Sequence, residues 1–322
     1  MTLPSTKAHV DLRLLNGGSM KANTKTIHDG VSDDDEDHMF RLYDWCFYIY
    51  QPELRRHVLW DVGMSNDGDA YISSIRDVMK VMSCVGPDKP LAQQLRDSCG
   101  VEPETIDTVL FSHAHFDHCR PIRHEFPNAH GFFGPGTEDD CKRKLEPWCT
   151  DPGVGHKFDP RFFDRARSTE TWSELKGPWV PFGPFDRAMD FFGNGSLWLI
   201  QAPGHMQGNL CAAARLADGS WVVLGSDCAH TKPLLDGKYD IAEVTRPDGS
   251  KWSLHEYVCA AKETIAKIHS LEVDHGCHIA LAHDASWMLK QTAEEKDPVL
   301  FGLLGDDFTE DVRERVARDE PF

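Results

Sequence analysis

Short apolar runs that end in polar turns recur along the chain, and they predict a structure rich in buried strands. The runs expected to form strands are residues 10–15, 40–50, 58–61, 108–111, 196–200, 221–224 and 278–282. They are grouped early and late in the chain, with segments of a different pattern between them. Periodicity by itself therefore indicates a mixed α/β fold.

Helical periodicity is clearest in two segments. Residues 91–99 are amphipathic and are followed by Gly100, which is typical of a helix end. Residues 255–269 carry one apolar stripe, formed by Tyr257, Val258, Ala261, Ile265 and Ile268. The charged residues 306–318 are expected to form a helix within a tail of residues 305–322.

The segment with the most specific chemistry is His113-Ala114-His115-Phe116-Asp117-His118, directly after the expected strand at 108–111. At a strand end, three imidazoles and a carboxylate can converge on one point, as a divalent cation requires. His together with Asp suits zinc, manganese or iron better than calcium or magnesium, which prefer oxygen ligands. The segment therefore predicts part of a metal site, and a polar loop rich in histidine is the alternative.

One loop cannot complete a metal site, so further ligands are expected elsewhere in the chain. His205, Asp227 and His283 each stand just after an apolar run, the same position as the first cluster. A single His or Asp at a strand end is more often a turn former or a cap. Three of them in addition to the cluster favour a shared site.

These residues, in this order, resemble the ligand motif of the metallo-β-lactamase superfamily of binuclear metallohydrolases. Residues 113–118 match the pattern His-x-His-x-Asp-His, and His205, Asp227 and His283 follow as in that family. Residues 58–64 are similar to the family's early strand, which ends in Asp and Gly. The resemblance extends from about residue 12 to residue 284, and it implies an αββα sandwich.

The resemblance also implies a binuclear centre. Its cations would be held by His113, His115 and His205 at one position and by Asp117, His118 and His283 at the other, with Asp227 as the bridge. The expected cations are Zn²⁺, with Mn²⁺ or Fe²⁺ as alternatives. Such a pair lowers the pKa of a bridging water to about 7, so hydroxide can attack a polarised carbonyl at neutral pH. Asp61 is expected to orient one of the ligand imidazoles.

Two positions separate branches within this superfamily. Asp227 stands where some β-lactamases have a cysteine ligand, which favours the lactonase, thioesterase and phosphodiesterase branches. Phe116 is similar to the acyl-homoserine lactonases, but these have a tyrosine three residues after the bridging Asp, where this chain has His230. We expect Asp117, Asp227 and His230 to act in catalysis. His230 or Asp227 would protonate the leaving group, or His230 would stabilise the oxyanion.

The candidate ligands span residues 113–283, which favours a single domain over residues 1–322. Within it, residues 140–192 form an insertion rich in aromatic residues and proline. Its aromatic residues are Trp148, Phe158, Phe162, Phe163, Trp172, Trp179, Phe182, Phe185, Phe191 and Phe192. The segment is expected to be a hydrophobic mini-core of its own or a cap that covers the metal site. On the second interpretation the substrate has an apolar part, and Met64, Phe116, Met206 and Trp287 line its pocket.

The formal charge of −18 argues against a nucleic-acid partner, because phosphate backbones favour clusters of Lys and Arg. It also argues, less strongly, against an acidic carrier protein and thus favours a small free substrate. Part of the charge lies in the acidic residues 33–37, which are expected to form a solvated loop between two early strands.

No membrane partner is expected, because no apolar run reaches about 18 residues. The amino terminus lacks the profile of a secretory signal, and ten cysteines in such a chain are expected to be reduced thiols. Cys228 and Cys277 lie near candidate ligands and are expected to be buried small side chains. A cytoplasmic location is the resulting prediction, and the oligomeric state is left open.

The leading hypothesis is a binuclear metallohydrolase that acts on a lactone, ester or thioester carbonyl of a small, partly apolar substrate. An iron-dependent oxidoreductase of the sulfur-dioxygenase type is an alternative, because the same ligands can hold iron. A carrier-protein thioesterase on the same fold is another. A binding or regulatory protein that has lost the chemistry is disfavoured by the complete ligand set.

Overall fold

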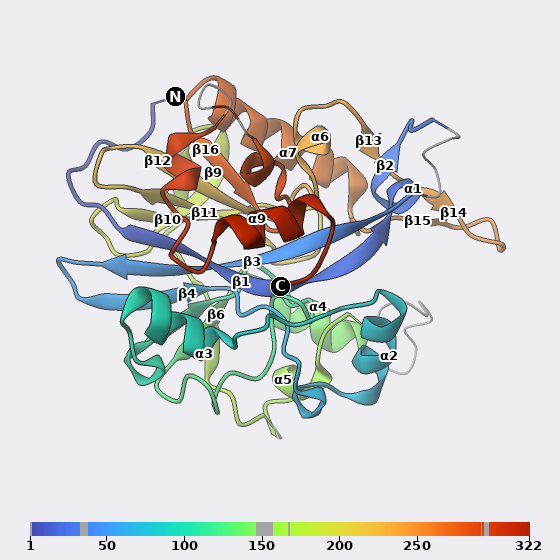
Figure 1. Ribbon diagram of the computed structural model, residues 1–322, viewed down its shortest axis with the longest axis horizontal. Coiled ribbons are helices and arrows are strands. Elements are labelled where there is room, and N and C mark those ends of the chain that lie inside the picture. The colour runs from blue at the N-terminus through green and yellow to red at the C-terminus, as the bar shows by residue number, and fades with distance from the viewer. Residues whose placement is uncertain (1, 33–37, 146–156, 167, 291, 293–295) are drawn as a thin grey trace.

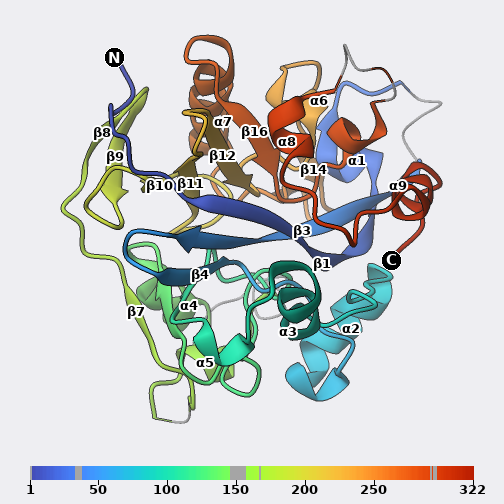
Figure 2. The ribbon, with the colours of Figure 1, turned by 60° about the vertical axis from the view of Figure 1, so that its left-hand side comes forward.

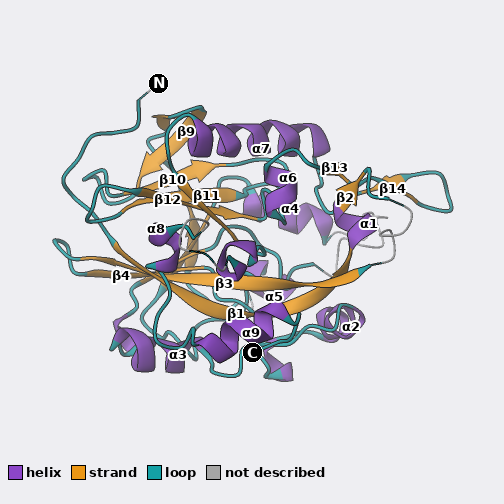
Figure 3. Ribbon diagram, turned by 45° about the horizontal axis from the view of Figure 1, so that its top comes forward, coloured by secondary structure: helices purple, strands orange, loops and turns teal. Residues whose placement is uncertain are grey.

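Two six-stranded sheets form the centre of the computed structural model, which describes all residues except 1, 33–37, 146–156, 167, 291 and 293–295 (Figure 1). The first sheet has the strand order β1-β3-β4-β5-β6-β7, and the second has the order β16-β12-β11-β10-β9-β8. Helix α7 lies on one outer side, and α2 and α3 lie on the other (Figure 3). The arrangement is the expected αββα sandwich.

The strands of the first sheet are β1 (Asp11–Asn23), β3 (Met39–Gln51), β4 (Arg56–Trp60), β5 (Thr108–Leu110), β6 (His130–Phe133) and β7 (Trp172–Glu174). Those of the second are β8 (Val180–Phe182), β9 (Phe185–Asp190), β10 (Leu197–Gln201), β11 (Leu210–Arg215), β12 (Trp221–Ser226) and β16 (His278–Leu281). Two small sheets pair β2 (His28–Asp29) with β13 (Asp240–Ile241) and β14 (Val244–Thr245) with β15 (Lys251–Trp252). Strands β4, β5, β6 and β7 pair parallel to one another, and β16 pairs parallel to β12, whereas β3 and β4 are antiparallel.

The α-helices are α1 (Thr24–Ile27), α2 (Ser73–Val81), α3 (Leu91–Gln94), α4 (Thr137–Lys144), α5 (Pro160–Phe163), α6 (Lys232–Leu235), α7 (Val258–Val273), α8 (Pro298–Phe301) and α9 (Glu310–Ala317). A π-helical turn, Leu95–Cys99, continues α3 and ends at Gly100, whose φ of 64° is left-handed. The helix end expected at Gly100 is therefore confirmed.

Side chains alternate between the two faces of each sheet, and this alternation divides the core into layers. In β3, Trp45 and Phe47 belong to the cluster between the sheets, whereas Cys46 belongs to the cluster under the first sheet. In β10, Leu199 points between the sheets, and Ile200 packs with the residues under α7. The middle layer thus joins both sheets through apolar contacts.

The expected strands are all present, and β1 continues well beyond residue 15. The pairing of β1 with β3 shifts register between Asn16 and Ser19, at a bulge, and then continues to Asn23. A Cβ at Gly63 would lie 2.4 Å from the Cα of Gly17, and the Met64 amide donates to the Gly17 carbonyl at 2.7 Å. The two glycines therefore allow the loop after β4 to approach the bulge closely.

Helix α7 begins and ends later than the expected 255–269, and its buried stripe differs in part. The buried residues are Ala261, Thr264, Ile268 and Leu271, whereas Tyr257 is 43% exposed. Ala261 and Ile268 of the expected stripe are thus confirmed, and Ile265 is partly buried against the same cluster. Thr264 was not expected in the stripe; its hydroxyl donates to the Pro203 carbonyl at 2.7 Å, in the loop before β11.

The C-terminal tail contains α9 over a shorter range than the expected 306–318. It is also less exposed than its charge indicated, because Phe308 and Val316 are buried in the middle layer. The Phe322 ring packs against Tyr43 and Trp45, with centroids 5.8 and 6.2 Å away. The tail therefore closes one side of the sandwich against β3.

The described residues of 140–192 pack on the two sheets and do not form a separate hydrophobic core. They supply β7 to one sheet and β8 and β9 to the other, along one edge of the molecule (Figure 2). Phe162 and Trp172 pack with Phe133 of β6, and Phe182 packs with Trp198 and Trp221 of the second sheet. Trp148 lies outside the described residues, as do the acidic residues 33–37.

The helices of the described part include none with the length and apolar character of a membrane span. Every cysteine that the structure describes is a free thiol, and Cys228 and Cys277 are buried as expected.

His28 provides a prediction about stability. Burial, with contributions from His230 and Lys238, lowers its pKa from 6.5 to about 4. Its Nε2 contacts the Thr231 hydroxyl at 2.8 Å, and its ring stacks on Tyr239. The unfolded chain therefore binds more protons between pH 4 and 6.5, and stability falls as the pH drops through this window.

We expect His28→Phe to reduce the stability lost between pH 7 and pH 4.5 by about 2 kcal/mol, because the variant has no imidazole to protonate. Urea unfolding at the two pH values measures this difference. An equal loss of stability in both proteins would contradict the assignment.

Candidate metal centre

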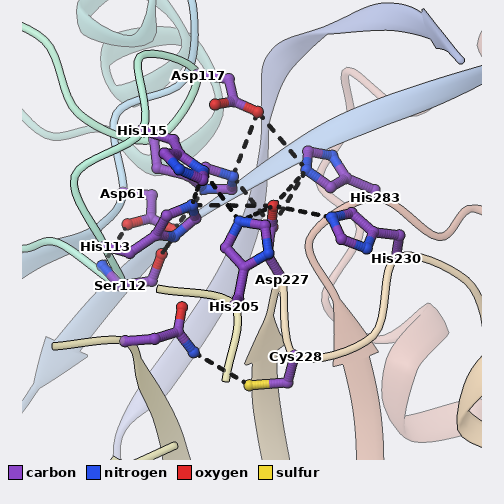
Figure 4. Close-up of polar contacts among 12 residues, drawn as sticks. Asp61, Ser112, His113, His115, Asp117, His205, Asp227, Cys228, His230 and His283 are labelled. Carbon is purple, nitrogen blue, oxygen red and sulfur yellow. Dashed lines mark hydrogen bonds and ion pairs between the residues drawn. The ribbon is translucent and has the colours of Figure 1, made fainter. Parts of the chain in front are cut away.

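The candidate ligands predicted from sequence lie together at the ends of four strands (Figure 4). Residues 113–118 form the loop after β5, and His205, Asp227 and His283 follow β10, β12 and β16. The two sheets are joined at this place, because the Leu210 amide donates to the Ser112 carbonyl at 2.8 Å. The middle layer thus holds the loops of both sheets at one edge of the sandwich.

Three imidazoles form the first group. His115 Nδ1 lies 3.0 Å from His113 Nε2 and 2.9 Å from His205 Nε2. The Oδ2 atom of Asp227 lies 3.3 Å from His205 Nε2 and 3.8 Å from His113 Nε2. The four side chains are buried and could hold one metal ion.

The second group contains both carboxylates. Asp227 Oδ1 lies 3.1 Å from His118 Nε2 and 3.1 Å from His283 Nε2. Asp117 Oδ2 lies 3.5 Å from His118 Nε2 and 3.6 Å from His283 Nε2. Asp227 therefore lies between the two groups: Oδ1 faces the second group, and Oδ2 lies 3.3 Å from His205 Nε2 and 3.2 Å from His283 Nε2.

The donor atoms of both groups suit metal cations. His118 Nε2 and Asp227 Oδ1 face each other at 3.1 Å but make no well-aligned hydrogen bond to any described residue, and such buried atoms are costly unless something satisfies them. Burial lowers the pKa of His113, His115 and His205 well below the ordinary value, so these rings stay neutral and able to coordinate.

In the second group, the carboxylates and the imidazoles stabilise each other's charged forms. Burial alone would raise the pKa of Asp227, but His283, His118 and His205 outweigh it and hold that pKa well below its usual range. Asp227 is thus a carboxylate at neutral pH. Burial would lower the pKa of His118, but Asp227, Asp117, Asp61 and Asp44 raise it well above 6.5.

Hydrogen bonds on the far side of the rings fix their orientation. His113 Nδ1 contacts the Ser112 hydroxyl at 3.0 Å, and His283 Nδ1 donates to the Tyr43 carbonyl at 2.6 Å. His118 Nδ1 lies 3.0 Å from Asp61 Oδ2, as expected for an orienting carboxylate. Asp61 is itself held by the Ser112 amide, which donates to its Oδ1 at 2.7 Å.

We expect Asp61→Asn to weaken metal binding by about tenfold, because the ring of His118 loses its anionic partner. Asparagine tolerates the left-handed φ of 58° at this position, so the backbone is retained. Competition with a chromogenic chelator measures the affinity, and Asp67→Asn in the nearby loop is the matched control. Unchanged affinity in Asp61→Asn would show that the contact does not support the ligand.

A cavity of about 490 Å³ opens onto these groups, and His230 and Phe116 lie on its wall. His230 Nε2 is 3.4 Å from Asp227 Oδ2, so the imidazole faces the bridging carboxylate. The other residues expected to line the pocket do not lie on its wall. Met64, Met206 and Trp287 are buried in three different hydrophobic clusters.

Apart from Phe116, the apolar wall of the cavity comes from elements that the sequence analysis did not assign to the pocket, namely β1, β3, α2 and the segment around β15. Its side chains are Met20, Met39, Leu42, Val78, Val81, Met82, Phe116, Trp252 and Leu254. Among the described residues of the segment 140–192, Lys157 alone lines it. In the described part of the chain, the early strands and α2 thus supply most of the apolar wall.

Two further residues at the site were missed. Asp44 in β3 is completely buried, lies 3.9 Å from His118 Nδ1, and has a pKa that burial raises well above the ordinary value. A carboxylate within an apolar strand was the available signal. His255, just before α7, packs its ring against His205 and His230. Sequence alone offered no signal for it.

No protein-family model matches the chain. A metallo-hydrolase of Annulohypoxylon moriforme is 28% identical over 277 residues, which are 75% of this chain and 70% of that protein. A cytochrome P450 monooxygenase of Penicillium brevicompactum is 29% identical over 75% of this chain, but the match is only 30% of that longer protein. A gamma-lactamase of Gibberella moniliformis is 29% identical over 54% of this chain and 70% of its own length.

Solved structures share the fold at low identity. An N-acyl homoserine lactone hydrolase, with the product N-hexanoyl-L-homoserine at its catalytic metal centre, has a TM-score of 0.57 and 15% identity over 89% of this chain and 95% of its own. A probable metal-dependent hydrolase from Staphylococcus aureus has a TM-score of 0.61 and 14% identity, over 88% of this chain and 91% of its own.

Proposed function

Because the chain belongs to the metallo-β-lactamase superfamily of metallohydrolases, near its lactonase-like branch, we propose that it hydrolyses a lactone, ester or thioester carbonyl with two divalent cations. The observation that carries the proposal is the position of Asp227. Its carboxylate lies between two groups of buried ligands and contacts His205 of the first and His118 and His283 of the second. The substrate is proposed to be a small molecule with an apolar part.

His113, His115 and His205 would hold one cation, and Asp117, His118 and His283 would hold the other, with Asp227 shared between them. Zinc is the proposed metal, since the donor set combines imidazoles and carboxylates. When bound, such a pair supplies Lewis acidity for the carbonyl and a water that loses its proton near neutral pH.

The protein's own groups would position and protonate the substrate. The His230 imidazole, on the cavity wall and close to Asp227, would donate a proton to the leaving oxygen or sulfur. Phe116, within the ligand loop, would pack against the part of the substrate next to the carbonyl. Asp227 would keep His230 in place through the contact between Oδ2 and Nε2.

The cavity wall supports the substrate class. Most of its side chains away from the ligands are apolar, which favours an acyl or aromatic group over a sugar or a phosphate. Val81 is 85% exposed and Met39 is 48% exposed at this wall, so an apolar substrate group could cover them. The described wall contains two lysines, Lys21 and Lys157.

A substrate panel tests the function. Purified protein is assayed with lactones, thioesters and aryl esters that carry either an acetyl or a decanoyl group, before and after dialysis against a chelator. We expect hydrolysis of at least one carbonyl class, a KM lower by about tenfold for the longer chain, and recovery of activity after Zn²⁺ is restored. Tightly bound iron with oxygen consumption and no hydrolysis would contradict the proposal.

A further inference from the structure

A second cluster of three imidazoles lies beside the ligands described above. It consists of His205, His230 and His255, whose exposed fractions are 3, 4 and 3%. One ring nitrogen of each residue lies within 4.8 Å of those of the other two. The proposed reaction uses His205 and His230 separately and gives His255 no role, so the cluster needs its own explanation.

The rings are arranged like those of the first ligand group. In that group the centroids of His113, His115 and His205 are 4.5, 4.7 and 4.7 Å apart, and the planes cross at 79 to 85°. In the second cluster the corresponding distances are 5.1, 5.3 and 4.9 Å, with angles of 64, 84 and 68°. Both are sets of three rings that meet edge to face around one point.

Buried ring nitrogens in this cluster have no hydrogen-bond partner among the residues that the structure describes. Both nitrogens of His255 and the Nδ1 of His205 are buried without a hydrogen bond in the structure. An imidazole isolated in this way loses the hydrogen bonds that it makes with water in the unfolded chain. A cation coordinated by the three rings would satisfy one nitrogen of each. If the rings served only as packing in the core, none of these nitrogens would be satisfied.

The backbone holds His255 firmly in this position. The amides of Glu256 and Tyr257 donate to the carbonyls of His205 and Gly204, at 3.0 and 2.9 Å. The Glu256 carboxylate also pairs with the buried ammonium of Lys144 at 2.6 Å. The loops that carry His205 and His255 are thus joined, which keeps the two rings together without a ligand.

We infer that His205, His230 and His255 form a third metal site, which takes a transition-metal dication such as Zn²⁺ or Co²⁺. An all-imidazole set selects these ions over Mg²⁺ and Ca²⁺, which prefer oxygen ligands. His205 would bind the first cation through Nε2 and the third through Nδ1, as a bridging imidazolate whose N–H proton is released to solvent. The third site therefore binds more weakly than the proposed pair, and it also contains no carboxylate and lies next to two other cations. The inference is independent of the substrate of the proposed hydrolase.

Metal titration of the whole protein tests the third site. Metal-free protein is dialysed to equilibrium against increasing Co²⁺, and the bound metal is measured by elemental analysis and by visible absorption. We expect about three equivalents at saturation, with the weakest producing its own absorption change. His255→Gln is expected to bind about two equivalents and to lack that last change. His124→Gln, which alters an exposed histidine outside both clusters, is expected to bind three.

Two equivalents at saturation in the unaltered protein would overturn the inference, even if His255→Gln failed to fold. Three equivalents in a folded His255→Gln protein would overturn it as well. The result is separate from the test of the proposed function. A protein that binds three ions but hydrolyses nothing in the panel would retain the third site and lose the hydrolase assignment.

Discussion

Asp227→Ala is expected to lower hydrolytic turnover by at least ~10³-fold and to reduce the metal that remains bound after desalting to less than one equivalent. Asp227 is the one residue whose oxygens contact both groups, at 3.1 Å from His118 and His283 and at 3.3 Å from His205. Its removal leaves each cation with fewer ligands and removes the negative charge between them. Elemental analysis and kinetic assays of the same sample measure both effects.

Asp186→Ala is the matched control, because that carboxylate is largely exposed and pairs only loosely with Lys267 at 3.4 Å. It should keep full activity and a full metal complement. An Asp227→Ala protein that has lost its metal and still turns over substrate would refute the proposed mechanism.

His230→Phe is expected to lower kcat by about 10²-fold while the proposed pair of cations stays bound, because the variant keeps the ring volume and loses the proton donor. Nε2 of His230 lies 3.4 Å from Asp227 Oδ2 on the cavity wall, where it can reach a leaving group. His230→Tyr should recover part of the loss, since a phenol can donate from the same position. Both variants are measured with two equivalents of metal, so that the third site does not affect the comparison.

A second readout separates proton donation from packing. Substrates with better leaving groups, such as nitrophenyl esters, need less protonation and should lose little rate in His230→Phe. An equal loss for good and poor leaving groups would assign His230 to another role.

The positions of the candidate ligands could be predicted from the sequence because they depend on local pattern. Each stands directly after an apolar run, and the ends of neighbouring strands meet at one edge of a sheet. The orienting role of Asp61 followed from the same reasoning. The expected strands at 196–200 and 278–282 correspond to β10 and β16 within one residue at each end.

Features that depend on long-range packing could not be predicted in this way. Strand β11 contains three consecutive alanines, which are not typical of strands, and it forms because it lies between β10 and β12. The aromatic residues of 140–192 were read as one unit, whereas Phe162 and Phe182 pack on different sheets. His255 joins the imidazole cluster only through the way in which α7 packs on the loop of His205.

Most residues of the cavity wall could not be predicted from local sequence pattern either. Met64, Met206 and Trp287 were chosen because they lie near motifs in the sequence, but each points into a hydrophobic cluster. Residues that do form the wall, such as Val78 and Val81 of α2, lie outside the motifs in the sequence, although they lie beside the ligands in space. Phe116 was predictable because it lies within the ligand loop itself.

Anomalous X-ray diffraction at the zinc edge, from crystals grown after exchange into Zn²⁺, tests the central claim most directly. We expect two strong peaks about 3.5 to 4 Å apart. One should lie within bonding distance of His113, His115 and His205, the other within bonding distance of Asp117, His118 and His283, and Asp227 should contact both. A single peak, or the absence of a peak at either of these two positions, would contradict a binuclear centre bridged by Asp227, whereas an additional weaker peak at His230 and His255 would belong to the third site.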